Sequence, residues 1–281
     1  MIDPADPEQL DRLLSRHGIE LQHRLGQNFL TDAALRDAIA NGAGVTRDDD
    51  VLEVGAGFGT LTVALAPLCR RLIAVEIDAG LIRALREVTR DQENVEIARA
   101  DILRFDVAAR FPTGGEVIAG NIPYNLTGAL IRKLLDRGPR PRRLSLVVQK
   151  EVAKRWAATS GASLATVAVQ VYAEARLAFT IPAAAFTPPP RVDSALVVLD
   201  VRQRPAIEVD DFDSFFRFVE SVFQQRRKQL GGTLARLSGT SREEASAQLG
   251  RIQVDPTRRP QTLTLSEWET LYGAFNPGVG R

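Results

Sequence analysis

The chain has 281 residues, of which 44% are hydrophobic and 25% are charged, a composition typical of folded globular proteins. Its net charge of +1 at pH 7 does not indicate a nucleic-acid binder, so any contact with RNA must come from local clusters of basic residues. One cysteine, Cys69, excludes an intramolecular disulfide and a thiolate metal cage, and neither His17 nor His23 has neighbouring ligands in the sequence, so no metal is expected.

Apolar periodicity predicts a helix over residues 7–15 and a second from about Thr31 to Gly42 or Gly44. From residue 51 onward, short apolar runs alternate with helix-length segments. Strands are predicted over 51–55, 71–76, 95–98, 116–120 and 144–149, and helices over 61–68, 80–89 and 127–135. Buried strands that alternate with helices favour a mostly parallel sheet covered on both faces.

The pattern changes after residue 150. Two further strands are predicted over 167–172 and 195–201, and they are expected to close the sheet as an antiparallel pair. Residues 202–209 read as a polar linker, and apolar residues then recur at helical spacing over 212–223, 230–237, 243–249 and 266–275. We therefore expect an N-terminal α/β domain over residues 1–204 and a small C-terminal helical domain over residues 205–281.

A glycine-rich turn follows the first predicted strand of the sheet. Gly55, Gly57 and Gly59 have the freedom to adopt positive φ and let a ligand approach the backbone closely. Glu76 ends the next strand, where it can accept hydrogen bonds from ribose hydroxyls, and Asp101 follows the third, where it can bind an adenine amine. The sequence shows no Walker-type lysine, so the pattern favours S-adenosylmethionine over NAD or ATP. The alternative is a tight turn without a ligand.

A second candidate site follows the strand predicted over 116–120. In the run Gly-Asn-Ile-Pro-Tyr, the Asn121 amide and the Ile122 carbonyl can each accept one N–H of an adenine amine. Pro123 stiffens the turn, and Tyr124 offers a ring on which a base can stack. Alignment of the amine with a methyl donor would then supply much of the rate. The alternative is an ordinary turn.

These motifs resemble those of the small-subunit ribosomal RNA adenine dimethyltransferases of the kasugamycin-resistance type, from about residue 24 to residue 275. The resemblance is carried by the runs at 25–30, 149–153, 185–194, 225–230 and 255–260, together with Gly55, Glu76, Asp101 and the Asn121 turn. It implies a Rossmann-like class I S-adenosylmethionine-dependent methyltransferase domain with a small C-terminal helical domain. Residues 159–166 are shorter and more neutral than the family pattern, which weakens the expectation of RNA contacts there.

The same resemblance implies the reaction and the site residues. The enzyme would dimethylate the N6 amines of two adjacent adenines in a loop near the 3′ end of small-subunit rRNA, within a pre-assembled subunit and coupled to subunit assembly. Asn28, Leu30, Gly55, Glu76, Asp101 and Asn121 would contact S-adenosylmethionine, with Gly57 in the same turn. Phe186 would stack on the adenine opposite Tyr124, although its alternative is an aromatic residue of the core.

RNA contacts are expected from clustered basic residues. The candidates are Arg140, Arg142, Arg143 and Lys150 in the first domain, and Arg226, Arg227 and Lys228 in the second. If they share a face they would bind phosphates with an affinity that falls with salt; the alternative is a solvated surface. No apolar run approaches the roughly 20 residues that span a bilayer, and residues 1–8 do not resemble a signal or transit peptide. We expect a monomeric cytoplasmic enzyme.

Three other readings remain open. The large-subunit rRNA dimethyltransferases of the macrolide-resistance type share the N-terminal motifs, although the runs at 225–228 and 255–256 favour the small-subunit enzyme. A DNA or protein-glutamine methyltransferase uses a similar asparagine turn but would lack the run at 25–30. A non-catalytic ribosome-assembly or transcription factor on the same fold would incorporate no methyl group.

Overall fold

The computed structural model describes residues 2–19, 28–123, 126–136, 138–160 and 163–275. The chain divides into two compact units, one formed by Met1–Lys154 with Glu174–Val201 and the other by Arg155–Ala173 with Arg202–Arg281. The expected boundary at residue 204 lies three positions after Val201, the last residue of the first unit. The segment 155–173, which we expected in the N-terminal domain, groups instead with the C-terminal helices.

A seven-stranded sheet forms the centre of the first unit. Its strands are β2 (Asp50–Val54), β3 (Arg71–Glu76), β4 (Val95–Arg99), β5 (Val117–Asn121), β6 (Arg143–Gln149), β7 (Ala173–Ile181) and β9 (Ser194–Val201). They lie in the order β4-β3-β2-β5-β6-β9-β7. The first five strands of this order are mutually parallel, and β9 is antiparallel to β6. The mostly parallel sheet predicted from the sequence is confirmed.

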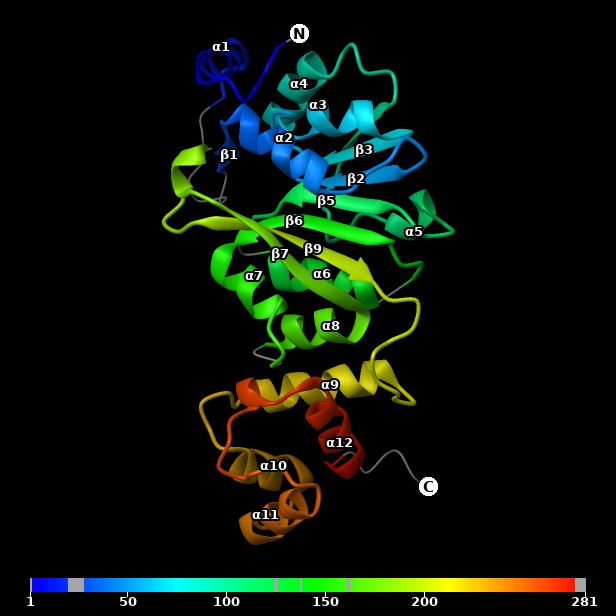
Figure 1. The fold of residues 1–281 in the computed structure, drawn as a ribbon, viewed down its shortest axis with the longest axis vertical. Coiled ribbons are helices and arrows are strands. Elements are labelled where there is room, and N and C mark those ends of the chain that lie inside the picture. Colours follow the sequence, from blue (N-terminus) through cyan, green and yellow to red (C-terminus); the bar gives the residue numbers. More distant parts are fainter. Residues whose placement is uncertain (1, 20–27, 124–125, 137, 161–162, 276–281) are drawn as a thin grey trace. The chain divides into compact units, whose positions relative to one another are not determined.

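Helices cover both faces of this sheet. The unit contains α2 (Ala33–Gly42), α3 (Thr62–Leu65) with the 3-10 turn η2 (Ala66–Leu68), α4 (Ala79–Val88), α5 (Val107–Arg110), α6 (Thr127–Asp136) and the start of α7 (Lys150–Trp156). The crossovers from β2 to β3 and from β3 to β4 step in one direction along the sheet, whereas the crossover from β5 to β6 steps in the other. Because such crossovers are right-handed, α3 and α4 lie on one face and α6 on the other (Figure 1).

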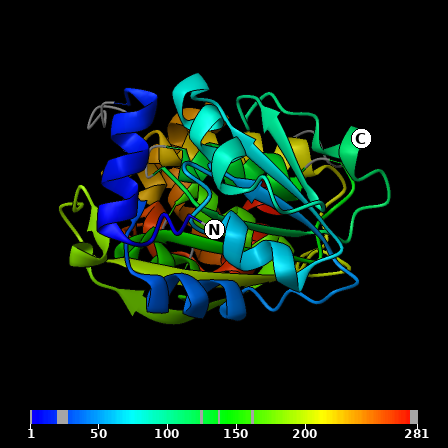
Figure 2. The same ribbon diagram turned by 90° about the horizontal axis from the view of Figure 1, so that it is seen from above.

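An additional helix and a small sheet precede this architecture. Helix α1 (Pro7–His17) begins at Asp6, whose side chain accepts from two backbone N–H groups, and ends at Gly18, where φ is 61°. Its apolar face packs beside α4 (Figures 1 and 2), where Leu10 and Leu13 join Phe58 of the glycine turn in one cluster. The short strand β1 (Phe29–Leu30) pairs antiparallel with β8 (Phe186–Thr187), which follows the 3-10 turn η3 (Ala183–Ala185).

The second unit is helical. It contains α8 (Leu164–Tyr172), α9 (Phe212–Phe223), α10 (Leu230–Ser238), α11 (Arg242–Arg251), the 3-10 turn η4 (Pro260–Thr262) and α12 (Leu265–Phe275). Phe215 and Tyr272 pack edge to face with their ring centroids 5.4 Å apart, and Trp268 is fully buried. None of the helices described here or in the first unit is long and apolar enough to cross a membrane.

The strand predicted over 167–172 is wrong, because these residues form the end of α8. All of them except Gln170 are apolar and buried, and a run of this kind does not distinguish a strand from a buried helix. Ser163 begins the helix, since its side chain accepts from the N–H of Thr166. The ring of Tyr172 then packs on that of Phe212, with their centroids 5.6 Å apart. The missing strand of the sheet is β7, which starts at Ala173.

Candidate active site

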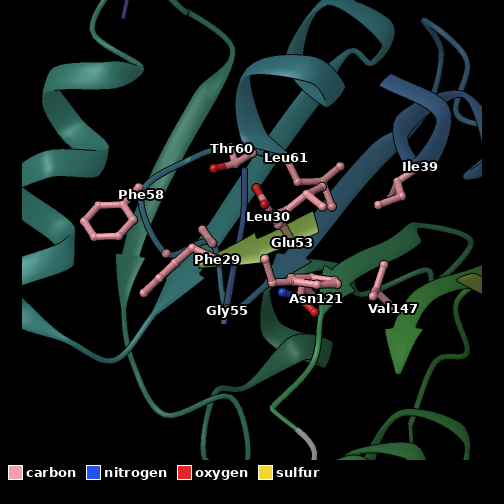
Figure 3. Close-up of a pocket in the computed structure, with 13 residues that line it drawn as sticks. Phe29, Leu30, Ile39, Glu53, Gly55, Phe58, Thr60, Leu61, Asn121 and Val147 are labelled. Carbon is pink, nitrogen blue, oxygen red and sulfur yellow. The ribbon is translucent and has the colours of Figure 1, made fainter. Parts of the chain in front are cut away.

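A pocket lies where β2 and β5 end. Because β2, β3, β4, β5 and β6 run parallel, their carboxyl ends meet at one edge of the sheet, where parallel α/β folds bind ligands. The hollow measures about 470 Å³ with its open mouth, a size that suits a small ligand. Of the residues predicted to form the site, it brings together Leu30, Gly55, Gly57, Asn121 and Phe186. Figure 3 labels Leu30, Gly55 and Asn121 among them.

The glycine turn after β2 contributes Gly55 and Gly57 to the wall of the pocket. Gly55 and Gly57 have φ of 71° and 59°, a region that strains residues with a side chain. A Cβ atom on Gly57 would lie 3.1 Å from the ring of Phe29, and one on Gly55 would lie 3.6 Å from the carbonyl oxygen of Asn121. The third glycine, Gly59, serves packing, because a Cβ there would lie 2.8 Å from Leu85.

Glu76 fixes the shape of this turn. One carboxylate oxygen accepts from the N–H of Gly57 at 2.8 Å, and the other accepts from Ile77 at 2.8 Å and Asp78 at 2.9 Å. Sequence reasoning gave Glu76 a role toward ribose and did not anticipate these three bonds. A carboxylate offers about four lone-pair sites, so one remains for a ligand hydroxyl.

Asp101 lies at the same edge, after β4. Its Oδ1 accepts from the N–H of Leu103 at 2.9 Å, and its Oδ2 lies 4.0 Å from the Arg104 guanidinium. The side chain is half-buried and is not part of the pocket wall. Asp101 therefore shapes the turn after β4, and its second oxygen lies beside the Arg104 guanidinium.

Asn121 is held by the segment that precedes β1. Its Nδ2 donates to the carbonyl oxygen of Asn28 at 2.9 Å, which turns Oδ1 away from Asn28 and leaves it as the acceptor of the amide. The following N–H, that of Ile122, donates to the carbonyl of Val147 on β6 at 3.0 Å. Close packing fixes the approach to this turn, because a Cβ on Gly120 would lie 2.4 Å from the carbonyl oxygen of Val54.

Phe186 is placed beside the pocket by the β1–β8 pair. Leu30 lies opposite Phe186 in this pair, and the Thr31 N–H donates to the carbonyl of Ala185 at 2.8 Å. The Phe186 side chain is 3% exposed and packs in the core with Leu30 and Val147 while it also lines the pocket. Its proposed partner Tyr124 lies outside the described residues, as do residues 25–27 of the N-terminal motif.

Sequence reasoning missed three residues of this region. Glu53 lies inside β2 and lines the pocket, and its signal was an acidic residue within an otherwise apolar strand. Phe29 packs on Phe58 with their ring centroids 4.4 Å apart, so that two aromatic rings support the glycine turn. Ile77 follows Glu76 and is 62% exposed, which places a large apolar side chain in solvent beside the site.

The basic residues predicted to bind RNA in the first unit lie toward opposite ends of β6. Arg143 begins β6 and Lys150 follows its end, so the two are separated by the length of the strand, about 20 Å. Arg142 pairs with Asp49 at 2.7 Å and Arg143 with Asp200 at 2.6 Å, while the Arg140 Nε donates to the carbonyl of Leu135.

Lys150 lies at the edge that carries the pocket. Its Nζ is 3.5 Å from Asp193, and its N–H donates to the Asp193 carbonyl at 3.0 Å. Asp193 also accepts from the N–H of Ala183 at 3.2 Å. Lys150 therefore helps to hold the loop that leads into and out of Phe186.

The three candidates in the second unit are exposed. Arg226, Arg227 and Lys228 lie in the turn between α9 and α10, and within the described ranges none of them pairs with a carboxylate. Nearby, Arg258 is committed to Glu267 through both of its terminal nitrogens. The described residues also contain no group of three His, Cys, Asp or Glu side chains suited to hold a metal ion.

Strand order, the glycine turn and the acidic residue that ends β3 define a Rossmann-like domain of the class I S-adenosylmethionine-dependent methyltransferases, joined to a helical C-terminal unit. A family model described as ribosomal RNA adenine dimethylase matches residues 18–271. The chain therefore belongs to the ribosomal RNA adenine dimethylase family.

Individual relatives agree with this assignment. The chain is 39% identical to the Ribosomal RNA small subunit methyltransferase A of Pelotomaculum thermopropionicum, with 100% of each chain covered. It is 35% identical to the protein of the same name from Geobacillus thermodenitrificans, with 98% of each covered. Among solved structures, the 23S rRNA methyltransferase ErmE is 28% identical with a TM-score of 0.68, covering 89% of this chain and 100% of that one.

A further solved structure supports the fold. The dimethyladenosine transferase from Plasmodium falciparum has a TM-score of 0.71 and is 24% identical, covering 88% of this chain and 97% of that chain. The resemblance inferred from the motifs is thus confirmed at the level of the family and of the methyltransferase fold.

Proposed function

We propose that this protein transfers methyl groups from S-adenosylmethionine to the N6 amines of two adjacent adenines in a loop near the 3′ end of small-subunit rRNA. The family match and the full-length relatives named for the small subunit support this proposal. The observation that carries it is the Asn121 amide, which stands beside the glycine turn with its nitrogen held by Asn28 and its oxygen left as an acceptor.

The residues in the pocket wall and at the neighbouring strand ends fit the cofactor. The turn at Gly55 and Gly57 would cradle it, and the remaining lone pair of Glu76 would accept from a ribose hydroxyl. Asp101 would bind the adenine amine through Oδ2, while the exposed Ile77 would lie against the ring. When bound, S-adenosylmethionine supplies an electrophilic methyl group.

The acceptor amine needs help because its lone pair is delocalised into the adenine ring. Oδ1 of Asn121 and the backbone carbonyl of Ile122 would each accept one N–H, which draws the nitrogen toward a pyramidal geometry. These contacts act on the reacting nitrogen and so are expected to be strongest in the transition state. A strong general base is not required, since the proton on nitrogen becomes acidic once the methyl group has transferred.

The adenine must leave its stack in the RNA to reach this amide, at a cost of a few kcal/mol. Phe186 on β8 and Tyr124 would offset that cost by stacking on the two faces of the base. The pairing of β8 with β1 supports this role, because it brings Phe186 into the wall of the pocket that contains Asn121.

RNA binding is proposed for the exposed residues Arg226, Arg227 and Lys228 and for Lys150 beside the pocket. Arg140, Arg142 and Arg143 would contact phosphates far from the reacting base, and the last two must share their charge with acidic partners. The proposed partner is small-subunit rRNA within a pre-assembled subunit, and the enzyme would act as a cytoplasmic monomer.

A second target is large-subunit rRNA, which the similarity to the 23S rRNA methyltransferase ErmE favours. Incubation of the protein with methyl-labelled S-adenosylmethionine and separate small and large subunits from cells lacking the gene distinguishes the two. We expect label as dimethyladenosine in the small-subunit rRNA. Label confined to the large subunit would support the second target, and label in neither would indicate a non-catalytic factor.

A further inference from the structure

The Glu53 carboxyl group is an acid in the pocket wall that the proposed chemistry does not use. Glu53 lies on β2 two positions before Gly55, its side chain is 1% exposed, and it lines the same pocket as Gly55 and Asn121. Its Oε2 accepts from the Thr62 hydroxyl at 2.6 Å. Figure 3 shows the carboxylate rising toward Thr60 and Leu61 at the side of the hollow.

No positive side chain balances this carboxyl. Among the described residues, no Lys, Arg or His lies within ion-pair distance of it. Its titratable neighbours are Glu76 on β3 and Cys69 after η2, and neither carries positive charge. Strands β5 and β1 and helix α3 contribute no titratable side chain, and Arg36 and Asp37 on α2 pair with each other.

Burial accordingly favours the neutral acid in this site. Desolvation raises the pKa of Glu53 to about 8, against the hydrogen bond from Thr62, which favours the ionised form, and the nearby charge of Glu76 raises it further. At neutral pH the carboxyl is therefore mainly protonated. A buried carboxyl of this kind becomes a strong partner for any cation that enters the same low-dielectric space.

We propose that Glu53 is the charge partner of the cationic cofactor: it is neutral in the ligand-free pocket and ionises when S-adenosylmethionine binds, so that binding releases one proton to the buffer. The proposal rests on the proposed function for the identity of the cofactor. In this step the O–H bond of the Glu53 carboxyl group breaks, its electron pair stays on the carboxylate and the proton leaves to solvent. The new carboxylate then faces the sulfonium or the ammonium of the ligand.

Because cofactor binding is coupled to proton release, the proposal predicts both the pH dependence of the affinity and the number of protons released per ligand. Below the pKa of the free acid, cofactor affinity rises about tenfold for each pH unit, since a proton must leave for each ligand that binds. Release amounts to about 0.9 proton per ligand at pH 7 and falls toward zero by pH 9.5. The amino group of the cofactor also titrates near pH 8, so the parent protein must be compared with a variant that lacks only the acid.

The experiment is isothermal titration calorimetry of the full chain with S-adenosylmethionine at pH 6 to 9.5, in buffers of different ionisation enthalpy. Glu53→Gln keeps an acceptor for Thr62 and removes the acid. We expect this variant to lose the proton release and the tenfold-per-unit slope, and to bind more than tenfold more weakly than the parent at pH 8.5. Equal proton release in the parent and in Glu53→Gln would overturn the proposal.

Two further variants keep the test decisive. Glu116→Gln removes another buried acid, at the opposite edge of the sheet, and should leave proton release on cofactor binding unchanged. If Glu53→Gln does not fold, Thr62→Val replaces it, because loss of the hydroxyl donor favours the neutral acid and should shift the affinity profile to higher pH. An unshifted profile in a folded Thr62→Val protein would refute the role of Glu53.

Titrations with two ligands show whether Glu53 faces the ammonium or the sulfonium group of the cofactor. S-adenosylhomocysteine keeps the ammonium but has no sulfonium, so release with both ligands assigns the ammonium and release with S-adenosylmethionine alone assigns the sulfonium. Either result supports the proposal. A parent protein that binds neither ligand at any pH would instead contradict the proposed function, whereas tight binding without proton release would contradict the Glu53 proposal alone.

Discussion

Replacement of Glu76 tests how the pocket is built. In Glu76→Ala, the Gly57 N–H loses its buried acceptor, and the N–H groups of Ile77 and Asp78 lose theirs at a position open to water. A buried hydrogen bond to a charged group contributes about 1.5–3 kcal/mol. Water can replace the bonds to Ile77 and Asp78, so the loss of stability should stay near the value for the Gly57 bond alone.

The same change removes the proposed acceptor for a ribose hydroxyl. We expect S-adenosylmethionine to bind more weakly by about 1–3 kcal/mol, which corresponds to roughly 5–150-fold in the dissociation constant. Glu76→Gln keeps the size of the side chain but turns an NH₂ group toward N–H donors, so it should also weaken binding. Calorimetry gives the affinity and urea unfolding gives the stability.

Glu93→Ala is the matched control, because it removes an exposed carboxylate from the same unit. It should change neither quantity by more than about 0.5 kcal/mol. A folded Glu76→Ala protein that binds S-adenosylmethionine as tightly as the parent would refute the assignment of Glu76. Weakened binding with unchanged stability would show that the three backbone bonds contribute little to the turn.

Four other perturbations follow from the structure. Asn121→Ala should lower single-turnover methylation far more than cofactor affinity, and a rate within a few-fold of the parent would refute its action on the amine. Phe186→Ala should cost about 3–5 kcal/mol of stability because the ring is packed in the core, whereas Phe186→Leu keeps most of the bulk. A Leu variant that methylates at the parental rate would make Phe186 a packing residue, and slow methylation with normal cofactor binding would support stacking. Glu116→Gln should raise stability at pH 8 by about 3 kcal/mol but not at pH 4, measured by urea unfolding. Alanine at Arg226, Arg227 and Lys228 together should flatten the salt dependence of RNA binding by about 0.7–0.9 log units for each phosphate that the variant no longer binds, and an unchanged slope would exclude these residues from phosphate binding.

The direction of the stability change expected for Glu116→Gln follows from the burial of the Glu116 carboxyl group. Both carboxylate oxygens lack hydrogen-bond partners among the described residues, and desolvation raises the pKa to about 7 from an ordinary value of 4.5. Between these values the folded protein binds more protons than the unfolded chain, so stability is lost as pH rises through this range. Glutamine does not titrate, and it removes that loss. A stability difference that is equal at pH 4 and pH 8 would contradict this account.

The sequence predicted the parallel sheet because its signals are local. The apolar runs that became β2, β3 and β5 are short and bounded by turns, and Gly55, Glu76 and Asn121 at or just after their carboxyl ends mark one edge of the sheet. The prediction failed for the run that became the end of α8 because only Gln170 interrupts its apolar residues, so its periodicity does not separate a helix from a strand. There Ser163, which caps the helix, was the available signal.

Within the site, residue identities were easier to predict than their contacts. The pattern indicated that Glu76 and Asn121 matter, yet the bonds of Glu76 to the glycine turn and of Asn121 to Asn28 join residues 19 and 93 positions apart. Sequence spacing does not determine such contacts. In the same way, clustering along the chain grouped Arg142 with Lys150, whereas the length of β6 separates the opposite edges of the sheet.

The central claim is methylation of adjacent adenines in small-subunit rRNA, and modification mapping in cells tests it most directly. Ribosomal RNA from a strain with the gene and a strain without it would be digested and analysed by mass spectrometry. We expect two adjacent N6,N6-dimethyladenosines near the 3′ end of small-subunit rRNA that disappear without the gene and return with the parent protein but not with Asn121→Ala. Small-subunit modifications that are identical in both strains would contradict the account.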